Sequence, residues 1–596
     1  MKLEVCFLLM ITSISNNGKA SLESFAPANA HVLFEDTTKS SDASCYRPCK
    51  FNVKPRRCHY SFIVEPTVLE NGRTSISING MTPGPPINVC VNDVVVVEVK
   101  NKIPNEDISI HWHGIEQKGT PYMDGVPMVT QCPISYETTY KYAFIASSPG
   151  TYFYHADSVA HQSDGVYGSL IVNQPQPLEP HSALYDYDRS NENTIMFAAK
   201  FPELLTGNLE DVGRKVPNAL VINEYEEDVF KLFVIPGFAY KLRLINAIAI
   251  ECPVVVSIDQ HEMLVIATDG KPVKPLAAKS VLLYPGERMD VVVRASQEVG
   301  GYWLNARGTG ACAGLSTNTM LIYSGFNYTA MLHDDLNSVV SEPNLSPPVY
   351  GQQLDSLQDS STHQKIRPVY LGIDRNVIKF KETDNDFRYI SDAIPKRPFF
   401  PASLSLQDTG VVQINGKNFL YPNSPILLSP RGVKTESQCY VGEETRDKDP
   451  QCLQILKAFE GELLEIALVN EGFIFGSNES YTFHLHGYPM YVVATGQNAD
   501  NKPLSKEEFY NLDAEHKINR NLITPPIKDT IVVQNKGYTI VRVKIDKGGS
   551  WLLECRSCGQ ALPAAVLINV PQTLPKTITS LLSKCGSFRP PDVLLN

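Results

Sequence analysis

Hydrophobic positions along this chain fall into short runs separated by turn residues, a pattern that predicts β-strands. Within residues 60–178, the run Val94-Val95-Val96-Val97-Glu98-Val99 is dominated by β-branched side chains, which favour strands. The pairs Asn79-Gly80 and Pro83-Gly84 mark turns between such runs. We therefore expect residues 60–178 to form a β-sandwich.

The same pattern of short apolar runs and turns recurs over residues 190–328 and again over residues 367–572. The run Ile78-Asn79-Gly80 of the first region returns as Ile414-Asn415-Gly416 in the third, which indicates copies of one module. Residues 329–366 are rich in Ser, Pro, Asp and Gln, and we expect them to form a linker. The sequence thus predicts an all-β chain with three sandwich domains.

The two ends of the chain differ from its middle. A basic start, a short apolar core and a small residue at Ala20 are typical of a secretory signal peptide over residues 1–20, with an ordinary buried segment as the alternative. Residues 21–59 are a cysteine-rich N-terminal segment, and residues 573–596 are expected to be an irregular tail. No later apolar run reaches the ~20 residues that span a membrane, so we expect a secreted, extracellular protein.

Composition narrows the possible partners. The 596 residues are enough for about three to five domains. The formal net charge of -11 argues against nucleic acid as a partner. If the chain is exported, three Asn-x-Ser/Thr triplets are glycosylation acceptors, at Asn327, Asn344 and Asn478.

The thirteen cysteines indicate disulfide bonds, because one lies in the predicted signal peptide and an even number remains. The cluster between Cys45 and Cys58 lacks C-x-x-C units, which favours a disulfide knot over a zinc site. Cys555 and Cys558 do form a C-x-x-C, but at a strand end, which disfavours a thioredoxin-type centre. A local disulfide and an inert buried thiol at Cys555 both remain open. The pairing also stays open for Cys45, Cys49, Cys58 and Cys90.

Two His-x-His pairs carry the candidate chemistry. In the run Ile110–Gly114, His111 and His113 share one face of a strand and Trp112 points to the other, because side chains alternate along a strand. The run Phe483–Gly487 holds a similar pair. In the late run Trp551–Gln560, the same alternation places the two residues beside Cys555 on the face opposite its sulfur.

These runs, together with Gly150–Asp157, resemble the copper motifs of the multicopper oxidases, and in particular laccase-like proteins of insects whose copper sites have lost ligands. The resemblance covers nearly the whole chain from about Cys45, and it implies three cupredoxin-like domains with a Greek-key β-sandwich fold, the second without copper. Where the family carries His-Cys-His-x-x-x-His, this chain keeps only the cysteine.

Carried over position by position, the resemblance assigns the following residues. Type 2 copper would use His111 and His484. One type 3 copper would use His113, His155 and the position of Arg556, and the other would use His486 and the positions of Asp157 and Glu554. Type 1 copper would use the positions of Tyr481, Cys555 and Gln560, with Ala565 at the axial place.

The losses bear on function. Type 1 copper loses both imidazoles, and Arg556 is a fixed cation that cannot act as a ligand. We therefore expect a laccase-like homologue that is not a competent oxidase and that acts by binding a metal or an extracellular protein or matrix partner, as a monomer. The alternatives are a residual copper oxidoreductase acting on phenols or ferrous iron, and an extracellular metal carrier.

Two interpretations remain for the residual cluster of His111, His113, His155, Asp157, His484, His486 and Glu554. It could hold copper, or zinc as the alternative, but not the full four-copper complement. It could instead be a metal-free polar core in which Arg556 pairs with Glu554 or Asp157. The resemblance further suggests a disulfide between Cys132 and Cys585. Proximity along the chain favours two more, Cys252–Cys312 and Cys439–Cys452.

Overall fold

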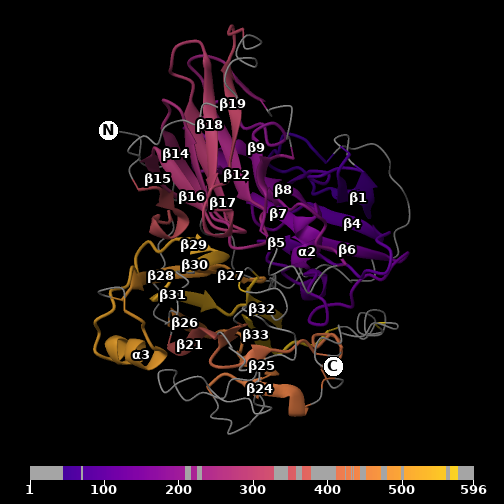
Figure 1. Ribbon diagram of the computed structural model, residues 1–596, viewed down its shortest axis with the longest axis vertical. Helices are drawn as coiled ribbons and strands as arrows, with labels where there is room; N and C mark the ends of the chain where they lie inside the picture. The colour runs from indigo at the N-terminus through magenta and orange to yellow at the C-terminus, as the bar shows by residue number, and fades with distance from the viewer. Residues whose placement is uncertain are drawn as a thin grey trace, which may run out of the picture. The chain divides into compact units, whose positions relative to one another are not determined.

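In the computed structural model the regular secondary structure is mostly β-strand with few helices, as the sequence pattern predicts (Figure 1). It describes residues 45–68, 72–207, 216–224, 231–327, 347–357, 365–376, 411–422, 424–430, 433, 435–442, 451–471, 480–498, 502–556, 558, 564–574 and 585. None of the helices within these ranges is long and apolar enough to cross a membrane. The predicted signal peptide, Asn344, Asn478 and Gln560 lie outside the described residues. Asn327 is described and exposed.

The first domain is a sandwich of two four-stranded sheets, ordered β2-β1-β4-β6 and β3-β8-β7-β5. One sheet holds β1 (Arg57–Val68), β2 (Thr74–Ile78), β4 (Val94–Asn101) and β6 (Thr139–Ile145), and the other holds β3 (Ile87–Cys90), β5 (Ile110–His113), β7 (Gly150–Ala156) and β8 (Tyr167–Asn173). The short helix α2 (Val159–Ser163) follows β7. Parallel pairing of β1 with β4 and of β3 with β8 shows that distant strands, not only hairpin neighbours, build this sandwich.

The second domain has two six-stranded sheets, ordered β10-β9-β12-β17-β14-β15 and β11-β19-β18-β13-β16-β20. The first holds β9 (Thr194–Lys200), β10 (Ala219–Ile222), β12 (Ala239–Asn246), β14 (Met263–Thr268), β15 (Lys271–Ala278) and β17 (Arg288–Arg294). The second holds β11 (Lys231–Val234), β13 (Val254–Ile258), β16 (Ser280–Leu283), β18 (Gly301–Gly308), β19 (Ser316–Tyr323) and β20 (Val349–Tyr350). Strand β20 lies in the predicted linker and pairs in parallel with β16, so part of that segment belongs to the second domain.

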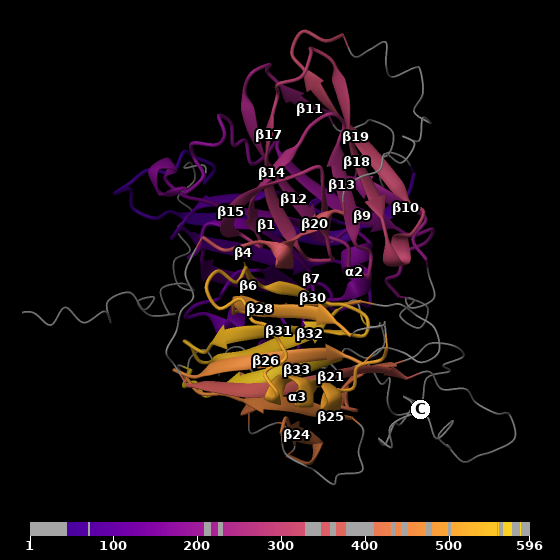
Figure 2. The same cartoon turned by 90° about the vertical axis from the view of Figure 1, so that its left-hand side faces the viewer.

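The third domain contains a sheet ordered β22-β21-β26-β31-β28-β29 and one ordered β23-β25-β33-β32-β27-β30, with β24 beside β25. Figure 2 shows β28, β31, β26 and β21 stacked in this order. The first sheet holds β21 (Ile366–Asn376), β22 (Val411–Ile414), β26 (Leu463–Asn470), β28 (Met490–Gln497), β29 (Ile527–Lys528) and β31 (Gly537–Lys544). The second holds β23 (Asn418–Phe419), β24 (Gln438–Tyr440), β25 (Gln451–Lys457), β27 (Tyr481–Leu485), β30 (Thr530–Val533), β32 (Gly549–Cys555) and β33 (Ala564–Val570).

Helix α3 (Lys506–Ala514) covers the outer face of the third domain. Ser505 caps its first turn by accepting a hydrogen bond from the Glu508 amide. Its buried residue Phe509 packs with Val469 and Ile540 of the sheet beneath. Single turns of 3₁₀-helix occur at Pro121–Met123, Gln176–Leu178, Gly310–Cys312, Gly351–Gln353 and Thr435–Ser437.

A repeated turn relates the three domains. Asn79 and Asn415, which the sequence repeat singled out, both adopt positive φ angles, of 56° and 52°. Asn223 in the second domain does the same, at 51°. Asparagine tolerates this backbone conformation and its side chain can bond the backbone. In each case the side-chain amide oxygen accepts from a backbone N–H of the first long strand of the same domain. The donors are Ile63 for Asn79, Met196 for Asn223 and Gly372 for Asn415.

Six disulfide bonds cross-link the described chain. Three of them are the pairs expected from the sequence: Cys132–Cys585, Cys252–Cys312 and Cys439–Cys452. The N-terminal cluster forms Cys45–Cys58 and Cys49–Cys90, which removes these cysteines from any zinc site. The last pair is Cys555–Cys558, so the open question there is decided for the local disulfide.

Candidate metal centre

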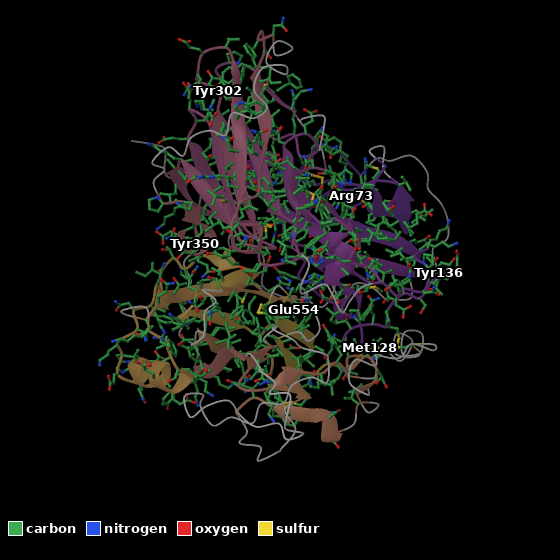
Figure 3. All side chains as sticks on the ribbon, viewed as in Figure 1. Arg73, Met128, Tyr136, Tyr302, Tyr350 and Glu554 are labelled. Atoms are coloured by element: carbon green, nitrogen blue, oxygen red, sulfur yellow. A yellow bond between two sulfur atoms is a disulfide. The ribbon has the colours of Figure 1, made fainter. Side chains whose placement is uncertain are left out.

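Two pairs of neighbouring strands place the His motifs in one buried centre. In the first domain β5 pairs with β7 so that His111 lies opposite His155. In the third domain β27 pairs with β32 so that His484 lies opposite Glu554, whose label marks the centre in Figure 3. The five histidines of the motifs are all buried. The structure therefore brings together the residues that the sequence assigned to the cluster.

Strand alternation separates these side chains from their neighbours as predicted. Trp112, between His111 and His113, points into the core of the first domain, with its ring 4.9 Å from the Phe144 ring and 5.3 Å from the Tyr142 ring. Cys555, between Glu554 and Arg556, is buried in the core of the third domain. Each strand thus serves a domain core with one face and the centre with the other.

The first imidazole pair joins the two domains. The Nε2 atoms of His111 and His484 lie 3.2 Å apart. The Nδ1 atom of His111 is 2.8 Å from the Asp124 carbonyl oxygen, and that of His484 is 3.0 Å from the Asp529 carbonyl oxygen. A carbonyl oxygen only accepts hydrogen bonds, so both Nδ1 atoms carry the proton. Two Nε2 lone pairs therefore face each other.

The second imidazole pair lies within the first domain. The Nδ1 atom of His113 is 3.1 Å from Nε2 of His155, whose Nδ1 donates to the Ala156 carbonyl. The Thr530 hydroxyl lies 2.8 Å from His113 Nε2 and donates to the Asp529 carboxylate, so it accepts from His113. The proton of His113 is therefore on Nε2, and its Nδ1 lone pair faces the Nε2 atom of His155.

These four histidines, which we call the imidazole half, are held neutral. Burial lowers the pKa of His111, His113 and His155 well below the usual value, and neighbouring groups lower it further. The pKa of His484 is lowered as well, first by burial. Neutral imidazole is the form that binds metal. The described residues contain three groupings with metal-ligand spacing: His111, His484 and His486; His111, His113 and His155; His113, His484 and Asp529.

The other side of the centre, which we call the carboxylate half, consists of Asp124, Asp157, His486 and Glu554. His486 Nδ1 lies 2.8 Å from Asp124 Oδ2, and its Nε2 lies 3.2 Å from Glu554 Oε1. Burial disfavours its charge, but the two carboxylates outweigh burial and raise the pKa of His486 to about 10. Burial and then the charge of Glu554 raise the pKa of Asp157 to about 7. His486 is therefore a buried imidazolium between two carboxylates.

Arg556 lies against the imidazole half. Its Nη1 atom is 2.7 Å from Nδ1 and 3.0 Å from Nε2 of His155. Its Nη2 atom donates to the carbonyl oxygens of Ala156 and Asp157, at 3.1 Å and 2.6 Å. Its Nε atom is 3.9 Å from Glu554 Oε1. The sequence predicted a pairing with Glu554 or Asp157. The structure gives a long ion pair with Glu554 and a backbone contact at Asp157.

Among the described residues at the positions that the family resemblance assigns to type 1 copper, none is an imidazole or a free thiolate. Tyr481 is buried at the start of β27, and Ala565 is buried in β33. The sulfur of Cys555 is bonded to Cys558 rather than free as a thiolate. A blue copper site needs that thiolate and two imidazoles, so these residues do not fit type 1 copper.

Sequence reasoning missed the residues that hold the centre from outside. Both terminal nitrogens of the Arg288 guanidinium, in the second domain, donate to the Asp529 carboxylate in the third. The adjacent Lys528 lies 2.9 Å from carboxylate oxygens of both Asp269 and Glu287. No sequence pattern linked Glu287 and Arg288 to Lys528 and Asp529, which lie about 240 positions later in the chain. No sequence pattern indicated that Asp124 pairs with His486.

A small cavity of about 30 Å³ adjoins the imidazole half. Its lining includes His113, His155, His484, Thr530 and Arg556. That volume is enough for a water-sized ligand with polar partners.

The sequence of this chain is similar to those of known multicopper oxidases. Models of multicopper oxidase domains match residues 64–177, 182–330 and 420–557. Laccase-1 of Botryotinia fuckeliana is 26% identical over 562 residues, which cover 89% of this chain and 87% of that protein. The L-ascorbate oxidase of Cucurbita pepo var. melopepo is 27% identical over 542 residues, which cover 83% of this chain and 91% of that protein.

Solved structures show the same fold. The laccase from Botrytis aclada superposes with a TM-score of 0.67 at 22% identity, covering 91% of this chain and 92% of that one. Fet3p, a multicopper oxidase that functions in iron import, gives a TM-score of 0.66 at 19% identity, with coverage of 86% and 90%. The three-domain arrangement of cupredoxin-like sandwiches is thus shared.

Proposed function

Because the chain belongs to the multicopper oxidase family, we propose that it is a secreted laccase-like homologue that binds one metal ion between His111 and His484 and lacks laccase-type oxidase activity. Copper is the expected ion, since the family binds copper, and zinc is the alternative. Its role would be binding, of the metal itself or of an extracellular partner.

The observation that carries the metal proposal is the contact between His111 and His484. Their Nε2 atoms are 3.2 Å apart, and both lone pairs point at each other because both Nδ1 protons are used on backbone carbonyls. Facing lone pairs repel, and a cation between them removes this repulsion. The carbonyls of Asp124 and Asp529 also fix the ring orientations, as partners of metal-binding histidines do.

The loss of oxidase activity follows from the residues that would accept and pass electrons. The Cys555 sulfur is in a disulfide and Tyr481 stands where an imidazole would be, so substrate electrons have no copper entry site. In the type 3 positions, Glu554 is bound to His486 and Arg556 to His155. These side chains fit each other and do not fit a coupled copper pair.

The test is metal content, absorption and oxygen uptake of the purified protein. We expect about one tightly held ion per chain, lost in His111→Ala and kept in His261→Ala. His261 is a matched control because it is buried in the second domain, bonded to Asp259 and Tyr323. With copper the protein should show no intense blue band and no oxygen consumption with phenols or ferrous iron. A blue band, or substrate-dependent oxygen uptake that disappears in His111→Ala, would refute the proposal in favour of the residual oxidase.

A further inference from the structure

The two imidazole pairs of the centre have similar distances between their ring nitrogens, 3.2 Å and 3.1 Å, but different surroundings. The pair formed by His113 and His155 has a guanidinium directly against it, because Arg556 Nη1 is 3.0 Å from His155 Nε2. That nitrogen is also the one that lies 3.1 Å from His113 Nδ1. A cation is thus already present where an ion bound to this pair would be.

Arg556 is held in this position by several groups. Its Nη2 atom donates to the Ala156 and Asp157 carbonyls, at the end of the strand that carries His155. Its Nε atom is 3.9 Å from the Glu554 carboxylate, and only 13% of its side chain is exposed. Guanidinium keeps its charge at any pH a protein tolerates and has no lone pair to offer a metal.

From these contacts we propose that Arg556 is a tethered cation that takes the place of a metal ion at the His113–His155 pair and so limits the centre to one ion. The inference builds on the proposed function, which assigns that ion to His111 and His484. Arg556 then acts as a residue that sets the metal stoichiometry of this chain.

The physical basis is repulsion between like charges in a buried site. A zinc or copper ion binds histidine nitrogen at about 2 Å, so an ion on His155 Nε2 would lie within about 5 Å of Arg556 Nη1. At that distance, away from bulk water, two cations repel strongly. The guanidinium meanwhile donates to the imidazole and to two carbonyls, which offsets its own burial.

The experiment compares metal stoichiometry between wild-type and variant chains by equilibrium dialysis of the purified protein against zinc, followed by elemental analysis. Arg556→Gln removes the charge and keeps a polar side chain, and we expect the bound zinc to rise from one ion per chain to two. Adding His155→Ala to this variant should return the count to one. Arg556→His is the second variant, with the same expected gain, in case the glutamine variant does not fold.

Two control variants separate this effect from a general loss of charge. Arg520→Gln removes another partly buried arginine of the third domain, bonded to Glu465 and Asp513, and should leave one ion. Arg556→Lys keeps a cation at the site and should also leave one ion. A folded Arg556→Gln or Arg556→His chain that still binds one ion overturns the inference. So does wild-type protein that binds a second ion lost in His155→Ala.

The design also distinguishes this inference from the proposed function. If wild-type protein binds no ion but Arg556→Gln binds one that His155→Ala removes, the His111–His484 site fails and the role of Arg556 stands. If wild-type protein binds one ion that is lost in His111→Ala, and Arg556→Gln adds none, the His111–His484 site stands and the role of Arg556 fails.

Discussion

In the imidazole half of the centre the buried rings are neutral and donate their protons to backbone carbonyls or to Thr530. In the carboxylate half the one imidazole is charged and lies between two carboxylates. The side chains of both halves are buried, apart from the half-buried Asp157. They differ in their partners: the carboxylates that balance the charge of His486 belong to the protein, whereas the cation that would suit the facing nitrogens of His111 and His484 must be bound from solution.

This difference separates folding stability from metal binding, two properties that are usually linked in a metal site. The carboxylate half satisfies its own charges, so it contributes to folding whether or not a metal is bound. The His111–His484 pair has unshared lone pairs directed at each other and is improved by an added cation. We therefore expect substitutions in the two halves to have opposite effects on stability and on metal content.

The largest effect is expected from Glu554→Ala. This change leaves His486 with only one of its two carboxylate partners, and breaking a buried pair costs about 3 kcal/mol of unfolding free energy. Metal content should not change. Urea unfolding and metal analysis of the same preparation measure both quantities.

Two further variants define the cause of that loss. Glu554→Gln keeps an oxygen that can accept from His486 but removes the charge, so it should fall between wild type and Glu554→Ala. Glu137→Ala breaks an exposed ion pair with Lys100 and should cost less than about 1 kcal/mol. Equal stability of wild type and Glu554→Ala would show that the carboxylate half does not act as a folded-state ion pair.

A somewhat smaller effect is expected from His484→Ala, and it should depend on metal. Metal that binds only the folded protein stabilises it by about 2.7 kcal/mol at a hundredfold excess over Kd. The variant should lose this increment, because His484 supplies one of the two facing nitrogens. A chelator added to wild-type protein should abolish the same increment. A zinc-dependent rise in melting temperature that survives in His484→Ala would place the ion elsewhere.

Much of this comparison could be predicted from sequence. The period of two in Ile110–Gly114 and Phe483–Gly487 was enough to place the imidazoles on one face and Trp112 in a core. The resemblance to a known family then implied that the two strands meet. The repeat Ile-Asn-Gly also indicated a shared turn, but it missed Asn223, because Glu224 replaces the glycine while the backbone conformation persists.

The remainder required three-dimensional contacts. Protonation of the imidazoles is decided by carbonyls of Asp124 and Asp529, and a carbonyl is present at every residue, so the sequence carries no mark of it. The pairing of Arg288 with Asp529 joins positions 241 apart. Likewise, the composition of residues 329–366 suggested a linker, whereas β20 is fixed by pairing with a distant strand.

The smallest effect is expected from Asp157→Asn, which tests whether all of the carboxylate half contributes equally. Burial and the nearby charge of Glu554 raise the pKa of Asp157 to about 7, so its negative charge is disfavoured in the folded protein. The contacts of this residue with Arg556 and Ser109 use its backbone carbonyl and N–H, which asparagine keeps. We therefore expect a change in unfolding free energy below about 1 kcal/mol and an unchanged metal content.

Glu554→Gln, the matched amide substitution, should cost clearly more in the same urea titration, because Glu554 holds His486. Equal losses in the two amide variants would mean that both carboxylates share the imidazolium. A loss of metal in Asp157→Asn would instead make Asp157 part of the metal site.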